Sequence, residues 1–489
     1  MAARDDSQDL ATFGYRQELN RTLGSFSSFA TGFSYISILT GLFQTFALGF
    51  GAGHEAFIWS WPMVVIGQFL VALGFAELAA HYPLSGGAYQ WSKMVGSPFL
   101  GWIVGWTYIA CLIVTLAAVA LALQSILPQI SAHFQFAGPS AVNAVLLGCG
   151  LLLVTTLLNS AGVGLLTRVN NLGVFTELIG VLILIAALCV RAVRPVDQVL
   201  FPPAVAGRSF LAPLLVSAAM TASYVLYGFD TAGSLAEETK NPRRNAPRGI
   251  LRALAAASGL GMLVLLFALM AAGNLRAAEL SRADGGLAWL VKSVLGERFG
   301  TILLCDVVFA IMVCALAVHA GAVRLIFAMA RDGKLPFSGA LARVSPETKT
   351  PVVPAIVTGG LAILILAVNV NLPRLIELVT MVAVLWANLA YLFVTVALFR
   401  RRIAGWPASE PRRPGSSFSL GRWGIPVNLA AAAWSAFMVL NVGWPRAEIY
   451  GSEWSSRLAP LLLTGILLTA GISSYFFMQR QLKLAASKE

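Results

Sequence analysis

The chain has 489 residues, of which 58% are hydrophobic and 11% charged, and its mean hydropathy is +0.78. Because soluble domains carry about 25% charged residues, this composition excludes a soluble globular protein and indicates a polytopic membrane protein. The net charge of +12 would favour nucleic-acid binding in a soluble protein. Here the basic residues lie at the ends of apolar segments, as the positive-inside rule requires, so no nucleic-acid partner is expected.

Twelve apolar segments reach the length of about 20 residues that a membrane-spanning helix needs. They are predicted at 26–50, 57–80, 99–127, 139–159, 164–191, 209–235, 249–273, 301–329, 352–370, 374–398, 425–444 and 457–479. With the N-terminus inside, the inner segments hold 24 Lys and Arg and the outer segments hold 10. This asymmetry predicts that both termini are cytoplasmic, in a multi-pass protein of the plasma (inner) membrane surrounded by lipid.

The sixth predicted span contains Tyr227, Gly228, Phe229 and Asp230 at mid-membrane depth. A carboxylate there costs at least a few kcal/mol, and a glycine weakens a helix by roughly 1 kcal/mol relative to alanine. Both in one apolar segment indicate an interrupted helix that lines a polar cavity. The first span has a matching polar interruption, which consists of Ser34, Ser37, Thr40 and Gly41.

Two interrupted helices five spans apart point to a transporter built from inverted repeats. The expected organisation is a cytoplasmic tail at 1–25, a first five-helix repeat at 26–191 and a second, inverted repeat at 209–398. A cytoplasmic loop at 399–424, two further helices at 425–479 and a cytoplasmic tail at 480–489 follow. The loop carries Pro407, Pro411 and Pro414, which favour irregular structure.

Several long motifs carry a family resemblance. The run GFDTAGSLAEETKNPRRNAPRGI at 228–250 resembles the sixth-helix motif of the amino acid–polyamine–organocation (APC) permeases. AELAAHYPLSGGAYQW at 76–91, RVNN at 168–171 and MARDGKLP at 329–336 are similar to further motifs of that superfamily. FSYISILTG at 33–41 resembles the branch of amino-acid, GABA and choline permeases. The resemblance implies an all-α, LeuT-type fold of twelve transmembrane helices, with two inverted five-helix repeats and two C-terminal helices.

The resemblance also implies a substrate site between the first and sixth helices. Thr40 and Gly41 match the small-residue break of the first helix, and Gly228 matches that of the sixth. Tyr224 matches an aromatic residue that closes over the substrate, and Glu177 stands where several proton-coupled relatives carry a lysine. The complete set of expected substrate-binding residues is Ser37, Ile38, Thr40, Gly41, Tyr224, Tyr227, Gly228, Phe229 and Asp230.

An interrupted helix exposes backbone N–H groups at one stump, which can hold a carboxylate, and C=O groups at the other, which can hold an ammonium group. Such a pair suits a zwitterion, whereas a cation needs only the carbonyls, an aromatic face and a carboxylate. Asp230 is either a substrate ligand or a structural acid that caps local N–H groups. Glu177 is either a proton carrier or a structural acid with satisfied hydrogen bonds.

Acidic residues at the inner helix ends are expected to form a gate. Glu237 and Glu238 are predicted to pair with Arg243, Arg244 or Arg248. Glu77 is predicted to do similar work with Lys93. His319 is expected to be a hydrogen-bonded packing residue inside its span.

The function that these features favour is secondary active transport of amino acids or related small amines by alternating access with proton coupling. A choline-, ethanolamine- or polyamine-type cation permease and an amino-acid exchanger are the alternatives, and a permease-like nutrient sensor is a third. An enzyme is not expected, because the chain lacks HExxH, P-loop and CxxC motifs. The five scattered cysteines imply no disulfide, and no metal, cofactor or partner subunit is expected.

Overall fold

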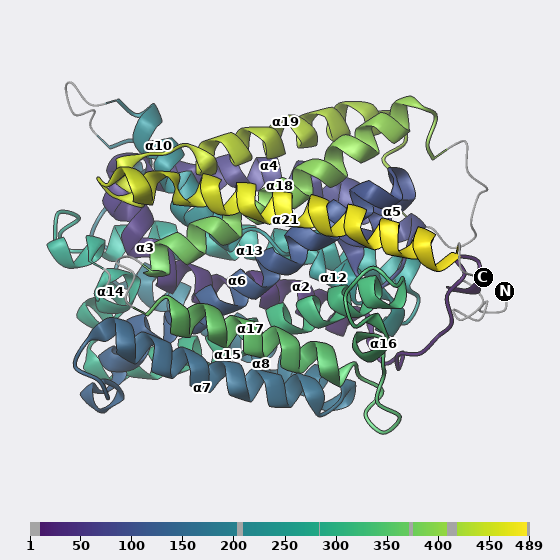
Figure 1. Ribbon diagram of the computed structural model, residues 1–489. Helices are drawn as coiled ribbons and strands as arrows, with labels where there is room; N and C mark the ends of the chain where they lie inside the picture. Colours follow the sequence, from purple (N-terminus) through teal and green to yellow (C-terminus); the bar gives the residue numbers. More distant parts are fainter. Residues whose placement is uncertain (1–9, 203–208, 283, 371–374, 408–417, 487–489) are drawn as a thin grey trace.

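The computed structural model describes residues 10–202, 209–282, 284–370, 375–407 and 418–486, which form one helical bundle. The described residues contain no β-strand, only an isolated bridge between Leu23 and Thr239. In Figure 1 the long helices run side by side, with α5 and α16 at one end of the bundle and α14 at the other. We refer to these as the α5 end and the α14 end.

The longer helices are α2 (Ser25–Ile36), α3 (Ile38–Gly53), α4 (Phe57–His81), α6 (Pro98–Ile130), α7 (Ser140–Ser160), α8 (Val163–Val190), α13 (Pro242–Ala271), α15 (Glu297–Arg331), α17 (Val352–Val368), α18 (Leu375–Ile403), α19 (Gly424–Gly443) and α21 (Trp454–Ala486). The shorter α-helices are α5 (Gly87–Val95), α9 (Val196–Leu200), α10 (Leu211–Ser217), α11 (Ser223–Val225), α12 (Thr231–Ser234), α14 (Gly286–Leu295), α16 (Ser338–Leu341) and α20 (Ala447–Tyr450). Brief 3₁₀ turns occur at His54–Ala56, Ala132–Phe134, Ala236–Glu238, Ala278–Ser281 and Gly421–Trp423, and a π-helical turn occupies Ala218–Ala222.

Nine helical stretches of the described residues are long and apolar enough to cross a membrane. The first of them, Ser25–His81, contains two of the predicted spans, 26–50 and 57–80. Two shorter apolar helices, Leu211–Val225 and Val352–Val368, lie within the sixth and ninth predicted spans. The chain is therefore a multi-pass helical membrane protein, and the count of twelve spans stays a prediction.

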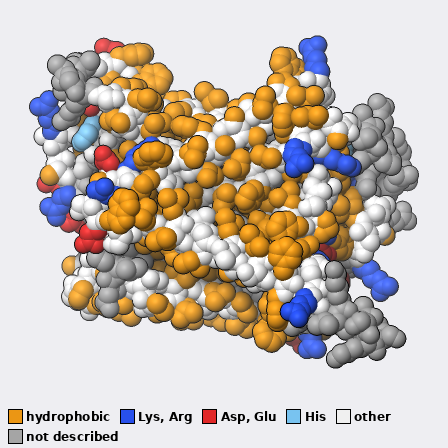
Figure 2. Space-filling view, turned by 45° about the horizontal axis from the view of Figure 1, so that its top comes forward, with side chains coloured by type: hydrophobic (Ala, Val, Ile, Leu, Met, Phe, Trp, Pro, Cys, Tyr) orange, Lys and Arg blue, Asp and Glu red, His pale blue; other side chains and the backbone are white. Residues whose placement is uncertain are grey.

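The outer surface fits a bilayer. Figure 2 shows hydrophobic side chains over the middle of the visible face, whereas charged side chains gather toward the two ends of the bundle. In the interior, α6 and α18 are the most enclosed of the long helices, and α21 lies on the outside. A helix that is apolar all round is stable only inside such a protein or in lipid, and both environments are used here.

Local sequence signals fix several helix ends. Ser97 accepts the Leu100 N–H at 3.2 Å and Pro98 follows it, so α6 begins where the Ser-Pro pair predicts. The helix α15 ends at Arg331, and Gly333 follows with a φ of 65°. The Lys334 N–H donates to the Met329 carbonyl at 2.9 Å, which satisfies an otherwise free carbonyl of the last turn. Both helix ends therefore lie where short local sequence signals occur.

The predicted loop at 399–424 is partly helical, because α18 continues to Ile403 and a 3₁₀ turn starts at Gly421. The backbone of Arg402 is thereby kept in a helix, and its guanidinium reaches the interior. The prolines Pro411 and Pro414 of this loop lie outside the described residues.

Candidate substrate site at two interrupted helices

The first interruption is a single residue. The helix α2 ends at Ile36, Ser37 adopts φ 33° and ψ 95°, and α3 begins at Ile38. The Ser37 hydroxyl accepts the Thr40 N–H at 3.4 Å, which caps α3. Thr40 and Gly41 therefore lie in the first turn of α3 and not in the break itself.

The second interruption separates α11 from α12. The segment α10–π-turn–α11 ends at Val225, and regular helix returns only at Thr231. Between them, Gly228 has a φ of 85°, a conformation that costs other residues about 1–2 kcal/mol. Its N–H donates to the hydroxyl of Tyr391 on α18 at 2.9 Å, so the freed backbone group is satisfied by a neighbouring helix.

The structure brings the two interruptions together. A Cβ on Gly41 would lie 2.7 Å from Val225 Cγ2, and a Cβ on Gly228 would lie 1.8 Å from Tyr35 Cδ1. The rings of Tyr35 and Tyr227 meet at 5.7 Å between centroids. Both glycines are thus required for close approach of the segments.

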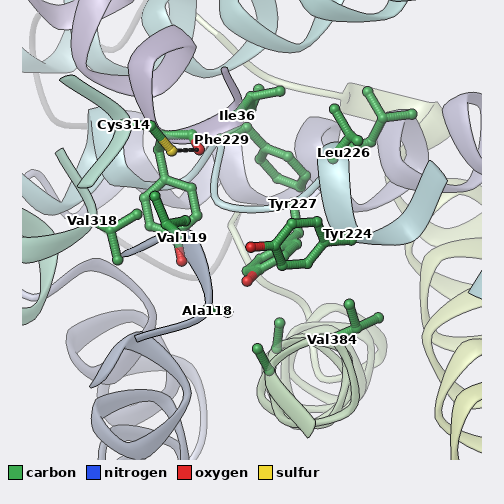
Figure 3. Packing of buried hydrophobic residues seen from close by; sticks show 14 of the residues in the cluster. Ile36, Ala118, Val119, Tyr224, Leu226, Tyr227, Phe229, Cys314, Val318 and Val384 are labelled. Atoms are coloured by element: carbon green, nitrogen blue, oxygen red, sulfur yellow. Dashed lines mark hydrogen bonds between the residues drawn. The ribbon is translucent and has the colours of Figure 1, made fainter. Parts of the chain in front are cut away.

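Aromatic side chains gather at this junction. Figure 3 shows Tyr224, Tyr227 and Phe229 around the second break, with Ala118 of α6 and Val384 of α18 nearby. The Tyr224 hydroxyl donates to Gln44 Oε1 of α3 at 3.1 Å. The predicted aromatic residues therefore come from one segment but contact the helices α2, α3, α4, α6 and α18.

Asp230 is fully buried and held by two phenols. Its Oδ1 accepts hydrogen bonds from the hydroxyls of Tyr108 at 2.7 Å and Tyr391 at 2.5 Å. Among the described residues, its Oδ2 has no hydrogen-bond partner. Hydrogen bonds from neutral donors can hold a carboxylate inside a protein, but one acceptor oxygen remains available to a ligand.

Glu177 on α8 reaches the first interruption. Its Oε1 accepts the Ser37 hydroxyl at 2.9 Å and the Leu39 N–H at 3.2 Å, while its Oε2 has no hydrogen-bond partner in the part of the chain that the structure describes. The side chain is only 1% exposed. Glu177 and Asp230 therefore present one free carboxyl oxygen each.

Sequence reasoning did not identify several contributors to this junction. Tyr35, Tyr108, Thr115 and Tyr391 lie in apolar spans, and the Thr115 and Tyr227 hydroxyls are 2.7 Å apart. A lone tyrosine in the middle of an apolar span is the signal that could have found Tyr108 and Tyr391, because a buried hydroxyl needs a partner. Their convergence on Asp230 depends on the packing of α6 and α18.

The expected pairing of the inner acids with arginines of α13 is wrong. Glu237 binds Arg331 through two hydrogen bonds of 2.8 and 2.9 Å, and Glu238 binds Arg324 at 2.7 and 3.1 Å. Both arginines belong to α15, which runs past the 3₁₀ turn Ala236–Glu238. Arg243 instead donates to the carbonyl oxygens of Ala80 and His81, because the start of α13 lies against the end of α4.

The expected pair of Glu77 with Lys93 is also wrong. Glu77 forms an ion pair with Arg402 and accepts the Ser419 hydroxyl and Leu420 N–H, each at 3.0 Å. Lys93 pairs with Asp332. Each acid pairs with a cation that lies close to it in space. The separation of two residues along the sequence does not reveal this distance.

The segment before α2 packs against the α5 end of the bundle. The Tyr15 hydroxyl donates to Asp332 at 2.8 Å, and the Arg331 guanidinium lies over the Tyr15 ring at 4.1 Å. Burial, together with the nearby Asp332 carboxylate, raises the pKa of Tyr15, so its hydroxyl stays neutral and donates. Gln17 adds a hydrogen bond to the Glu237 carbonyl at 3.1 Å.

His319 is a packing residue, as predicted. Its Nδ1 lies 3.2 Å from the Thr155 hydroxyl and its Nε2 lies 2.9 Å from the Ala355 carbonyl oxygen. Within the described residues, no three His, Cys, Asp or Glu side chains come together as a metal site.

A cleft opens next to the Glu238–Arg324 ion pair. It lies between α2, α8 and α15, and its polar lining includes Ser27, Thr31, Asn170, Asn171 and Glu238. At the second interruption, the Tyr35 ring packs on Gly228. Asp230 and Glu177 are not among the residues that line this cleft.

Apolar helices of membrane-spanning length, two interrupted helices and buried carboxylates at their junction are together typical of a membrane transport protein. Residues 23–468 match the family described as "Amino acid permease", and the chain belongs to this family of the APC superfamily. The "Amino-acid permease BAT1" of Arabidopsis thaliana is 27% identical over 96% of this chain and 94% of its own length.

Two relatives come from Bacillus subtilis (strain 168). The "Branched-chain amino acid permease BcaP" is 28% identical over 89% of this chain and 91% of its own length. The "Methylthioribose transporter" is 28% identical over 86% of this chain and 91% of its own length. These are transporters and not enzymes, so this chain is a permease of amino acids or other small molecules.

Proposed function

We propose that the protein is a secondary active transporter that moves amino acids or related small amines by alternating access, coupled to protons. The observation that carries the proposal is the junction of the two interrupted helices, where two buried acids each keep a free oxygen. A substrate amino group would lie near the aromatic rings and Asp230, since cations favour carboxylates and aromatic faces. The names of the relatives support an amino-acid cargo.

The proposed substrate site consists of the residues that line both interruptions. These are Ser37, Ile38, Thr40, Gly41, Tyr224, Tyr227, Gly228, Phe229 and Asp230, with Glu177 as the proton carrier. In this proposal the side chains of Tyr35, Tyr108, Thr115 and Tyr391 complete its walls.

The proposed architecture has twelve spans, with inverted repeats at 26–191 and 209–398. The α5 end faces the cytoplasm, because the inner side of a membrane protein carries the excess of Lys and Arg. The pairs Glu237–Arg331 and Glu238–Arg324, with the Tyr15 segment, then form the inner gate. The gate opens when these pairs separate and expose the cleft to the junction.

The alternative is a permease for an organic cation or another small solute. The relative named as a methylthioribose transporter supports it, since that name specifies no amino acid. The acidic junction is compatible with a choline-, ethanolamine- or polyamine-type cation. A thermal-shift panel of these amines and of amino acids separates the two, because a ligand at a hundredfold excess over Kd stabilises the folded protein by about 2.7 kcal/mol.

The proposed activity is tested by uptake into liposomes that contain the purified protein. We expect accumulation of a stabilising compound when the outside is acidic, in buffers free of sodium, and its loss when a protonophore collapses the gradient. Protein-free liposomes are the control. A requirement for sodium would contradict proton coupling, and absence of transport for every compound would contradict the function.

A further inference from the structure

The N–H groups at the N-terminal end of α3 already face acceptors within the protein. The first N–H groups of a helix normally lack partners and form a positive site for anions. Here the Leu39 N–H donates to Glu177 Oε1 at 3.2 Å, and the Ile38 N–H faces the same carboxyl group. The Thr40 N–H donates to the Ser37 hydroxyl and the Gly41 N–H to the Ser37 carbonyl at 3.0 Å. A substrate carboxylate therefore meets Glu177 where it would otherwise meet free backbone donors.

The other oxygen of Glu177 is the second observation. Oε2 is buried and has no hydrogen-bond partner among the described residues, although the side chain is only 1% exposed. A buried polar atom without a partner is costly unless a ligand or proton satisfies it. Glu177 is thus anchored to the helix end through one oxygen and available through the other.

Among the described residues, the groups around Glu177 provide no compensating cation. The helices α2 and α3 contain no Asp, Glu, Lys, Arg or His, and the basic residues of α13 stand near its start. From α15, Asp306 and Cys314 face Glu177. An ionised Glu177 would consequently repel a second carboxylate, with little to screen the two charges.

We propose that Glu177 is the ligand of the substrate carboxylate in its neutral form, so that one proton and one carboxylate-bearing substrate bind together. This inference rests on the proposed function and specifies the substrate class as carboxylate-bearing amino acids. Oε1 remains the acceptor for the α3 N–H groups, and the hydroxyl on Oε2 donates to the substrate carboxylate. The proton enters from water on the side from which the substrate comes, and it leaves when the carboxylate dissociates.

Asp230 does not suit this role. Its Oδ1 already accepts two phenol hydroxyls, and no backbone helix end depends on it in the way that α3 depends on Glu177. Two neutral donors on one oxygen leave Asp230 an acceptor, which matches an ammonium group. The two acids therefore take opposite ends of a zwitterion.

The test compares matched compounds that differ only in the carboxylate. Leucine is paired with 3-methylbutylamine and γ-aminobutyrate with propylamine, and Kd is measured on purified protein between about pH 5.5 and pH 9. For wild type, we expect the amino acid to bind up to about tenfold more weakly per pH unit above the titration of Glu177, as one linked proton requires. The matching amine should not show this weakening.

Glu177→Gln keeps an acceptor and a donor at the same two positions without a charge. We expect it to bind the amino acid at every pH as tightly as wild type does at low pH. Asp306→Asn is the matched control, because it removes the neighbouring acidic group and leaves the α3 contacts intact, and it should keep the wild-type pH dependence. A pH-dependent Kd in Glu177→Gln, or a flat profile in Asp306→Asn, would overturn the proposal.

A second readout does not depend on how the variant folds. Infrared difference spectra of wild type with and without the amino acid should show a shifted C=O band of a protonated carboxyl group, and labelling glutamate with ¹³C should move that band. If no such band responds, the proposal is wrong. Binding of the amine without the amino acid would overturn this inference and leave a cation permease, whereas binding of no amino acid or amine of the thermal-shift panel at any pH would reject the proposed function as well.

Discussion

The Glu238 carboxylate and the Arg324 guanidinium form an ion pair of two hydrogen bonds, at 2.7 and 3.1 Å, with both side chains 0% exposed. The pair joins the turn after α12 to α15 and lies beside the cleft at the α5 end. Two charges removed from water are stable only while they face each other. If this pair belongs to the proposed inner gate, water or a ligand must replace these contacts when the gate opens.

Breaking this pair should be strongly destabilising. We expect Glu238→Gln to lower the free energy of unfolding by about 3–5 kcal/mol, since it leaves the Arg324 charge buried without a counter-ion. Thermal unfolding in detergent measures the effect. Asp284→Asn, which breaks the exposed pair with Arg282, is the control and should leave the melting temperature unchanged. Equal losses in the two variants would refute this account of the gate.

Gly228 should tolerate no side chain. Gly228→Ala combines a φ of 85° with a Cβ placed 1.8 Å from the Tyr35 ring, so we expect a loss above the ~1–2 kcal/mol that the left-handed backbone alone costs. Gly259→Ala on α13 meets no atom within 4 Å and should be neutral or stabilising by up to about 1 kcal/mol.

A double-mutant cycle identifies the cause of the Gly228 effect. Replacing Tyr35 by Ala in the Gly228→Ala background should recover the part due to the ring clash and leave the backbone part. Strict additivity of the two single variants would show that the ring and the glycine do not interact.

Tyr224→Phe should shorten the time for which substrate stays bound. The variant leaves Gln44 Oε1 without its donor, a loss of about 1–3 kcal/mol for a buried group. If Tyr224 retains substrate, the dissociation rate of a radiolabelled ligand should rise more than the unfolding stability falls. Thr221→Val removes a comparable hydroxyl bond, to the Thr45 carbonyl of α3, and serves as the matched control. An unchanged dissociation rate in Tyr224→Phe would count against a gating role.

The segment before α2 should loosen when the Tyr15 hydroxyl is removed. Tyr15→Phe keeps the ring under Arg331 but loses the hydrogen bonds with Asp332 and Lys93, each worth about 1 kcal/mol or somewhat more when charged. Hydrogen exchange of residues 10–24 should accelerate, and Tyr15→Ala should accelerate it further. Identical exchange in Tyr15→Phe and wild type would mean that the ring alone fastens the segment.

Much of the fold could be predicted from sequence because its signals are local. Apolar length marks the spans, the Ser97–Pro98 pair marks a helix start, and Gly333 marks a helix end. The polar residues around Ser37 and Gly228 indicated the two interruptions, since polar and helix-breaking residues are costly inside an apolar span that stays helical throughout. The break at Ser37 proved shorter than expected, because a serine side chain can cap the next helix within one turn.

The sequence alone did not predict which charged residues pair with each other. The expected partners of Glu237 and Glu238 were close in the chain, whereas the observed ones, Arg331 and Arg324, lie on α15. An ion pair depends on the distance between side chains in space. A helix from a distant part of the sequence can place a cation as close to an acid as a neighbouring residue can. Glu77 and Arg402 illustrate the same point.

Composition and motif order by themselves determined that this is a helical membrane permease, because bilayer thickness and backbone hydrogen bonding leave apolar helices a recognisable pattern. Only the tertiary structure decided that Glu177 is anchored to the end of α3 and that Tyr108 and Tyr391 converge on Asp230. These contacts join residues from different helices, and their existence depends on how the helices pack. The same packing leaves one oxygen of each acid free, which is the feature on which the proposed transport chemistry depends.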